Sequence, residues 1–292
     1  ITPLGGKFDR TGVGPIQVWE RLDGTMEVIS GRHRFDLAKR SGETTIPAQV
    51  HREADGFTAR QAAVLDAKLN IREEQGSVAD YANYFKESGT TEDAAKSEGL
   101  LARAKGRAGF AIARDAVPDL LAAHSAGLLS DDAALGIALA APREPALQSL
   151  GIKLVNDGKS ILFAVNTMRA AGVMSAERKA AGQQADIFGF DDSAMREAEA
   201  MGKKVSALQR QIAEQISAVL GAVKRPEVAR KMGVDVHDPE SIKKKIDVLR
   251  QEQYQLDNWP LYPDIIAKIR ELKQEAPFTL QGETPAELKA RD

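Results

Sequence analysis

The chain has 292 residues, enough for about two domains with buried cores. Its 40 Lys and Arg and 42 Asp and Glu give a net charge of −2, so binding to nucleic acid would depend on a local basic patch. The absence of cysteine excludes disulfides, thiolate metal sites and cysteine nucleophiles, and four widely separated histidines leave little for a zinc site.

The sequence also allows a prediction of where in the cell the protein is located. No apolar run approaches the roughly 20 residues that a membrane helix needs, so we expect a soluble, cytoplasmic protein. The sequence begins at Ile1, without an initiator methionine or a signal-peptide pattern. We therefore expect it to be a piece of a longer protein.

Residues 1–76 are predicted to form a small α/β domain. Apolar, β-branched strands at 15–20 and 25–30 flank Asp23-Gly24, a dipeptide typical of hairpin turns. A helix is predicted over 32–40, closed by Ser41-Gly42, followed by a third strand at 46–50. A second helix is predicted over 58–74, with Thr58 as its N-cap.

Residues 77–172 are predicted to be entirely helical, as short helices separated by glycines. Helices of this length are stable only when they pack on one another. Acidic residues at several helix starts favour capping and dipole roles over metal binding. The helices are predicted at 78–87, 91–97, 101–115, 118–126, 131–140, 145–156 and 160–170.

Residues 173–292 are predicted to form a C-terminal helical region. A linker is expected at about 173–192, ending in the apolar segment 187–190. Apolar residues then recur at three- and four-residue steps over 201–223 and 242–256, which predicts a helical hairpin. Such a stripe serves either as an intramolecular core or as the seam of a homodimer. The fold class that follows is α+β, with domains at 1–76, 77–172 and 173–292.

The most informative segment is the start of the predicted helix at 32–40. Gly31 makes the turn after a strand, and Arg32, His33 and Arg34 occupy the first helical turn. Free N–H groups at a helix start favour an anion, and cations there are unfavourable by about 0.3 to 1 kcal/mol. A bound polyphosphate would reverse this penalty, whereas the alternative is a solvated basic helix start.

This segment resembles the N-terminal domain of the ParB and sulfiredoxin superfamily. The resemblance rests on Pro15-Ile16-x-Val18, the Gly24 turn, Gly31-Arg32-His33-Arg34 and the closing Ser41-Gly42. It implies that Gly31, Arg32, His33 and Arg34 bind the triphosphate of CTP or ATP. Arg32 stands at the position of the sulfiredoxin cysteine, so the redox repair of sulfiredoxin is excluded.

The resemblance to ParB continues through Asn70-Ile71-Arg72-Glu73-Glu74 and Ala79-Asp80-Tyr81-Ala82. It implies that Asn70 helps to bind the nucleotide and holds Mg²⁺, an ion that prefers oxygen ligands. The preceding metal-binding Glu of the family is replaced by Leu69. Glu73 and Glu74 are candidates to compensate for that loss, although carboxylates at a helix end more often face water.

A helix-turn-helix is the third part of the resemblance. Residues 91–99 match the first helix and its glycine turn, and the helix from about Leu101 matches the recognition helix. The candidate DNA-binding residues on this helix are Arg103, Lys105, Arg107 and Arg114. Small residues replace base-reading side chains and Gly106 and Gly109 weaken the helix, so backbone contact is expected more than base reading.

Three functions follow from the resemblance, which covers residues 13–170. The first is a nucleotide-dependent DNA-binding module for partition or processing, similar to the ParB-like modules, of DdrB type, in long proteins of phages and mobile elements. The second is a nuclease or NTPase in which His33, Glu73 and Glu74 are catalytic beside a metal. The third is a degenerate ParB-like fold that serves only as a protein-interaction module.

Overall fold

The computed structural model describes residues 6, 8–9, 14–182, 192–221, 227, 230, 233–235 and 237–272. The fold is mostly helical with one small sheet near the N-terminus, so the α+β class is confirmed. The chain forms two compact units, Ile1–Leu139 and Ala140–Asp292, and the sheet belongs to the first. Within the part of the chain that the structure describes, every helix is too short or too polar to cross a lipid bilayer.

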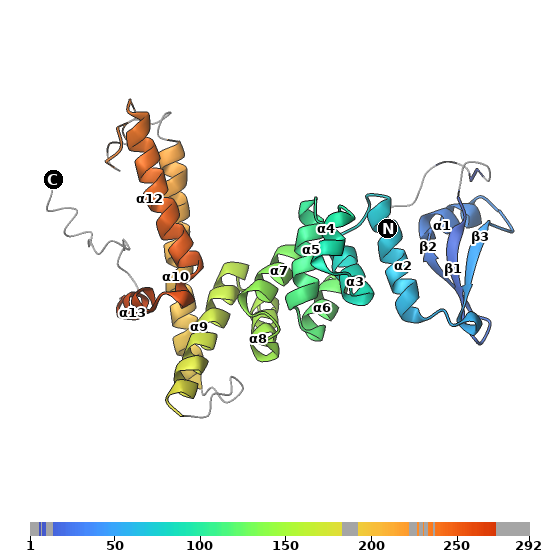
Figure 1. Cartoon of the computed structure of the whole chain (residues 1–292), viewed down its shortest axis with the longest axis horizontal. Coiled ribbons are helices and arrows are strands. Elements are labelled where there is room, and N and C mark those ends of the chain that lie inside the picture. The colour runs from blue at the N-terminus through green and yellow to red at the C-terminus, as the bar shows by residue number, and fades with distance from the viewer. Residues whose placement is uncertain are drawn as a thin grey trace. The chain divides into compact units, whose positions relative to one another are not determined.

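The sheet has three strands in the order β2-β1-β3 (Figure 1). Strands β1 (Ile16–Glu20) and β2 (Met26–Ser30) pair antiparallel around the expected turn, where the Asp23 carboxylate accepts a hydrogen bond from the Thr25 amide at 2.8 Å. Strand β3 (Ala48–Arg52) begins two residues later than expected and pairs parallel to β1. This parallel pairing requires a crossover, and helix α1 (Arg32–Arg40) lies within it.

Helix α2 (Ala59–Arg72) joins the sheet to the helices that follow. Thr58 caps it through a reciprocal pair of hydrogen bonds with Gln61, as the sequence predicts for its N-terminus. A short 3-10 helix, η1 (Glu53–Asp55), comes before it. Trp19 and Ile29 of the sheet form a buried cluster with Ala62 of α2, which fixes this helix against the strands.

The remaining helices of the first unit include α3, whose aromatic side chains form a buried cluster with alanines of the next two helices. These remaining helices are α3 (Val78–Ser88), α4 (Glu92–Ser97), α5 (Ala104–Asp115), α6 (Pro118–Ser125) and α7 (Asp131–Ala140). A Cβ atom on Gly109 would lie 2.4 Å from the Cβ of Tyr81, and one on Gly106 would clash with the Leu100 carbonyl. These glycines therefore allow α5 to approach α3 closely, a role that the sequence analysis did not assign to them.

The second unit contains α8 (Pro145–Asn156), α9 (Ile161–Ala180), α10 (Asp192–Leu220), α12 (Pro239–Asp257), the 3-10 helix η4 (Trp259–Leu261) and α13 (Pro263–Glu271). The prediction of a linker from residue 173 is wrong at its start, because α9 continues to Ala180. The side chain of Met174 is buried, so packing extends the helix past Gly172. The expected apolar segment 187–190 lies outside the described residues.

The predicted helical hairpin is present as α10 and α12, which lie side by side (Figure 1). The apolar stripe is buried within the chain at Met201, Val205, Leu208, Ile212 and Val219 of α10 and at Ile246, Leu249 and Leu256 of α12, whereas Val223 lies outside the described residues. The stripe therefore serves as an intramolecular core, and a homodimer through these helices stays a prediction.

Candidate functional site

The candidate anion site lies at the start of α1. Gly31 adopts a left-handed conformation with φ of 92°, and a Cβ there would come within 2.6 Å of the Ile16 side chain. Only glycine fits this turn between β2 and the helix. The helix has no carboxylate in its first turn and no side-chain cap, so its first amides keep their capacity to donate to an anion.

The two arginines at this helix start already contact the protein. Arg32 donates to the Asp66 carboxylate at 3.2 Å, with about half of its side chain still exposed (56 %). Arg34 is half-buried and donates to the carbonyl of Gly14 at 2.8 Å. His33, between them, is exposed. Arg34 therefore ties the chain before β1 to the helix, while Arg32 lies at the surface in an exchangeable ion pair.

Asp66 and Asp80 are the site residues that the sequence analysis missed. Asp66 lies one turn before Asn70 on α2, and Asn70 donates to the Asp80 carboxylate of α3 at 3.4 Å. Burial raises the pKa of the Asp66 carboxyl, and the nearby Asp80 charge raises it further against the opposing effect of Arg32. The four-residue spacing of Asp66 and Asn70 could have indicated this group, because such residues share one helix face.

The structure does not gather the three candidate catalytic residues. Glu73 ends α2, and Glu74 follows it in a left-handed conformation with φ of 63°. Glu74 accepts a hydrogen bond from Arg103 at 2.6 Å, and both side chains are mostly exposed. No contact joins His33 to Glu73 or Glu74 within the described ranges. A shared acid-base centre therefore has no support in the geometry.

Each candidate DNA-binding cation around α5 has a partner inside the protein. Arg103 pairs with Glu74, and Lys105 donates to the Gly76 carbonyl at 3.2 Å. Arg107 donates to the carbonyls of Leu101 and Ala102 at the helix start. Arg114 makes two hydrogen bonds to the buried Asp115 carboxylate. Helix α5 begins at Ala104, three residues later than expected, so Arg103 is its N-cap residue.

Comparison with known proteins does not assign a family or a function to this site. No protein-family model matches the chain, and no curated protein matches it. Among the residues that the structure describes, no three His, Asp or Glu side chains form a group that could hold a metal ion.

Proposed function

We propose that the N-terminal domain is a ParB-like module that binds a nucleoside triphosphate, CTP or ATP, at the start of α1. The observation that carries the proposal is the uncapped first turn of α1, which begins at the left-handed Gly31 and has cations where carboxylates are usual. A polyphosphate would accept hydrogen bonds from the amides and from Arg32 and be close to His33.

The contacts of the two arginines support different roles in such binding. Arg32 is exposed, and a phosphate would compete with Asp66 for its guanidinium. Arg34 donates to the Gly14 carbonyl and keeps the segment before β1 against the helix. We therefore propose that Arg32 contacts the phosphates directly and that Arg34 holds the helix start in position.

The family resemblance also implies Mg²⁺, and the oxygen-rich side chains beside Arg32 fit a hard cation. Asn70, Asp66 and Asp80 would hold the ion, which would neutralise phosphate charge. Release of Asp66 from Arg32 would make its carboxylate available for this role. Asn70 would at the same time give up its hydrogen bond to Asp80.

DNA binding through α4 and α5 belongs to the same proposal. The exposed side chains of α5 include Lys105, Arg107 and Arg114, and Arg103 lies just before them. The partners of Lys105 and Arg107 are backbone carbonyls and the partner of Arg103 is an exposed carboxylate, all of which phosphates could replace, whereas Arg114 pairs with the buried Asp115 carboxylate. We expect contacts to the DNA backbone, since no base-reading amide side chain lies on α5.

The test is a titration of the full chain with CTP and with ATP, with and without Mg²⁺, followed by thermal unfolding. A ligand at 100 times its dissociation constant stabilises the folded state by about 2.7 kcal/mol. We expect stabilisation that Arg32→Ala and His33→Ala reduce. Lys39→Ala, at the other end of α1, is the matched control and should leave it unchanged. No stabilisation by either nucleotide would refute the proposal.

A protein-interaction module without nucleotide is the second candidate. It is favoured by the internal partners of Arg32, Arg34 and the α5 cations, because a degenerate site satisfies its charges within the fold. This candidate predicts that neither nucleotide nor duplex DNA alters thermal unfolding. The titration above therefore separates the two.

A further inference from the structure

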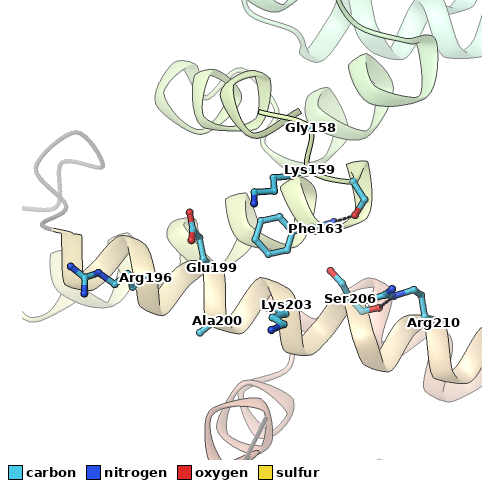
Figure 2. Close-up of a pocket in the computed structure, with 10 residues that line it drawn as sticks. Gly158, Lys159, Phe163, Arg196, Glu199, Ala200, Lys203, Ser206 and Arg210 are labelled. Carbon is cyan, nitrogen blue, oxygen red and sulfur yellow. Dashed lines mark hydrogen bonds between the residues drawn. The ribbon is translucent and has the colours of Figure 1, made fainter. Parts of the chain in front are cut away.

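A groove of about 570 Å³ lies in the second unit, between the turn that joins α8 to α9 and one face of α10 (Figure 2). Four cationic side chains line it, Lys159, Arg196, Lys203 and Arg210, against one carboxylate, Glu199. Four positive charges and one negative charge leave a net charge of +3. A groove of one sign concentrates oppositely charged ligands.

The groove cations differ from those of α5 because most of them lack internal partners. The side chains of Lys159, Arg196 and Lys203 are exposed and make no ion pair or hydrogen bond to any described residue. Arg210 donates only weakly, to the Ser206 carbonyl of its own helix at 3.3 Å. Three unpaired like charges in one groove repel one another, and an anionic ligand would remove that repulsion.

The cations of α10 form a line rather than a cluster. Arg196, Lys203 and Arg210 are seven residues apart and so lie on nearly the same helix face, as Figure 2 shows. At 1.5 Å per residue, the line is about 21 Å long. One phosphate group cannot reach all three side chains. The ligand that fits the line therefore carries several anionic groups in a row.

An aromatic ring completes the groove. The half-buried Phe163 extends from the first turn of α9 toward α10, and Lys159 lies beside it in Figure 2. The Ser160 hydroxyl accepts a hydrogen bond from the Phe163 amide at 3.3 Å, which fixes this turn. Grooves that bind single-stranded nucleic acid combine cations along the backbone with aromatic rings on which bases stack.

We propose that this groove binds a single-stranded nucleic acid, with its phosphates along Arg196, Lys203 and Arg210 and one base on Phe163. A duplex keeps its bases stacked on each other and would leave the ring unused. An acidic peptide would satisfy the cations but carries no regular series of flat bases. The proposal is independent of nucleotide binding at α1, which lies in the other unit.

The test uses the full chain and a fluorescent 20-residue oligothymidylate, with binding followed by anisotropy at several salt concentrations. The Arg196→Ala/Lys203→Ala/Arg210→Ala variant should weaken binding at least 30-fold and reduce the salt dependence by about 2 log units per log unit of salt, near 0.7 for each lost contact. The Lys243→Ala/Lys244→Ala/Arg250→Ala variant removes the same charge from α12 and should change the affinity less than threefold.

Two further measurements address the ring and the class of ligand. Phe163→Leu should weaken oligothymidylate binding at least fivefold and leave its salt dependence unchanged, as expected for lost stacking. Equal losses in the two triple variants would overturn the proposal. Equal binding of a mixed-sequence duplex, or displacement by polyglutamate at equal charge, would also overturn it. Arg32→Ala should leave oligothymidylate binding intact, which separates this result from failure of the nucleotide proposal.

Discussion

Arg103 donates a hydrogen bond of 2.6 Å to Glu74, 29 residues earlier in the chain. One residue is a candidate for DNA binding and the other a candidate for catalysis, and in this structure each neutralises the other. The pair also joins the end of α2 to the start of α5, since Arg103 is the N-cap residue of that helix. Any DNA contact by Arg103 would therefore have to displace this carboxylate.

The first prediction follows from that competition. Glu74→Ala removes the carboxylate, so Arg103 becomes available to a phosphate. We expect tighter binding to a 20-base-pair duplex and a salt dependence steeper by about 0.9 log units per log unit of salt, measured by fluorescence anisotropy. Glu73→Ala is the matched control, because it removes a neighbouring carboxylate that does not contact Arg103. Equal effects of the two substitutions would argue against a role for Arg103 in DNA binding.

Local features of the fold could be predicted from the sequence because a few adjacent residues determine them. Asp23-Gly24 marks the hairpin turn, and Thr58 with Gln61 forms the capping box of α2. The ion pairs of the candidate site depend instead on packing between distant segments. Arg32 meets Asp66 across 34 residues, and no periodicity or motif in the sequence indicates that contact.

The second prediction concerns the glycines of α5. An added Cβ on Gly109 would lie 2.4 Å from the Tyr81 Cβ and 2.9 Å from the Ala82 nitrogen, so α3 and α5 would have to separate. We expect Gly109→Ala to lower the free energy of unfolding by about 1 to 3 kcal/mol, as measured by urea denaturation. A Gly→Ala substitution inside a helix usually has the opposite effect and raises the free energy of unfolding, because alanine is more favourable there by about 1 kcal/mol.

Gly172 of α9 is the matched control for this substitution. Its added Cβ would meet only the Leu147 Cδ1 atom, at the ordinary contact distance of 3.4 Å. Gly172→Ala should therefore leave stability unchanged or raise it by up to about 1 kcal/mol. A stabilising Gly109→Ala would contradict the close approach of α3 and α5.

The third prediction is a pH dependence that arises from Asp66. Burial raises the pKa of its carboxyl in the folded chain, so the folded state binds this proton more tightly than the unfolded state does. The free energy of unfolding therefore falls as pH rises from the ordinary carboxyl pKa of about 3.9 through the raised value. Asp66→Asn removes this contribution, because asparagine does not titrate.

The measurement is the difference in free energy of unfolding between the native chain and Asp66→Asn, from urea denaturation at a series of pH values. We expect the difference, native minus variant, to decrease with rising pH through this window and then to become constant. A difference that increases with pH would mean that the charge of Arg32 outweighs burial at this carboxyl.

The last prediction concerns the buried polar network of the second unit. Asn166 is fully buried, donates to Ser206 at 3.1 Å and to Gln209 at 2.7 Å, and accepts from the Trp259 indole at 3.3 Å. Asn166→Ala leaves the indole N–H without its acceptor and leaves a cavity. Since an unsatisfied buried group costs about 1 to 3 kcal/mol, we expect a loss of at least 2 kcal/mol in the free energy of unfolding.

Ser206→Ala provides the comparison, because it removes one hydroxyl from the same network. Asn166 keeps its bonds to Gln209 and to Trp259 in that variant, so we expect a loss of about 1 kcal/mol. The measurement is urea denaturation followed by tryptophan fluorescence, to which Trp19 of the first unit contributes along with Trp259. The reverse order of the two variants would show that the indole bond to Asn166 contributes little.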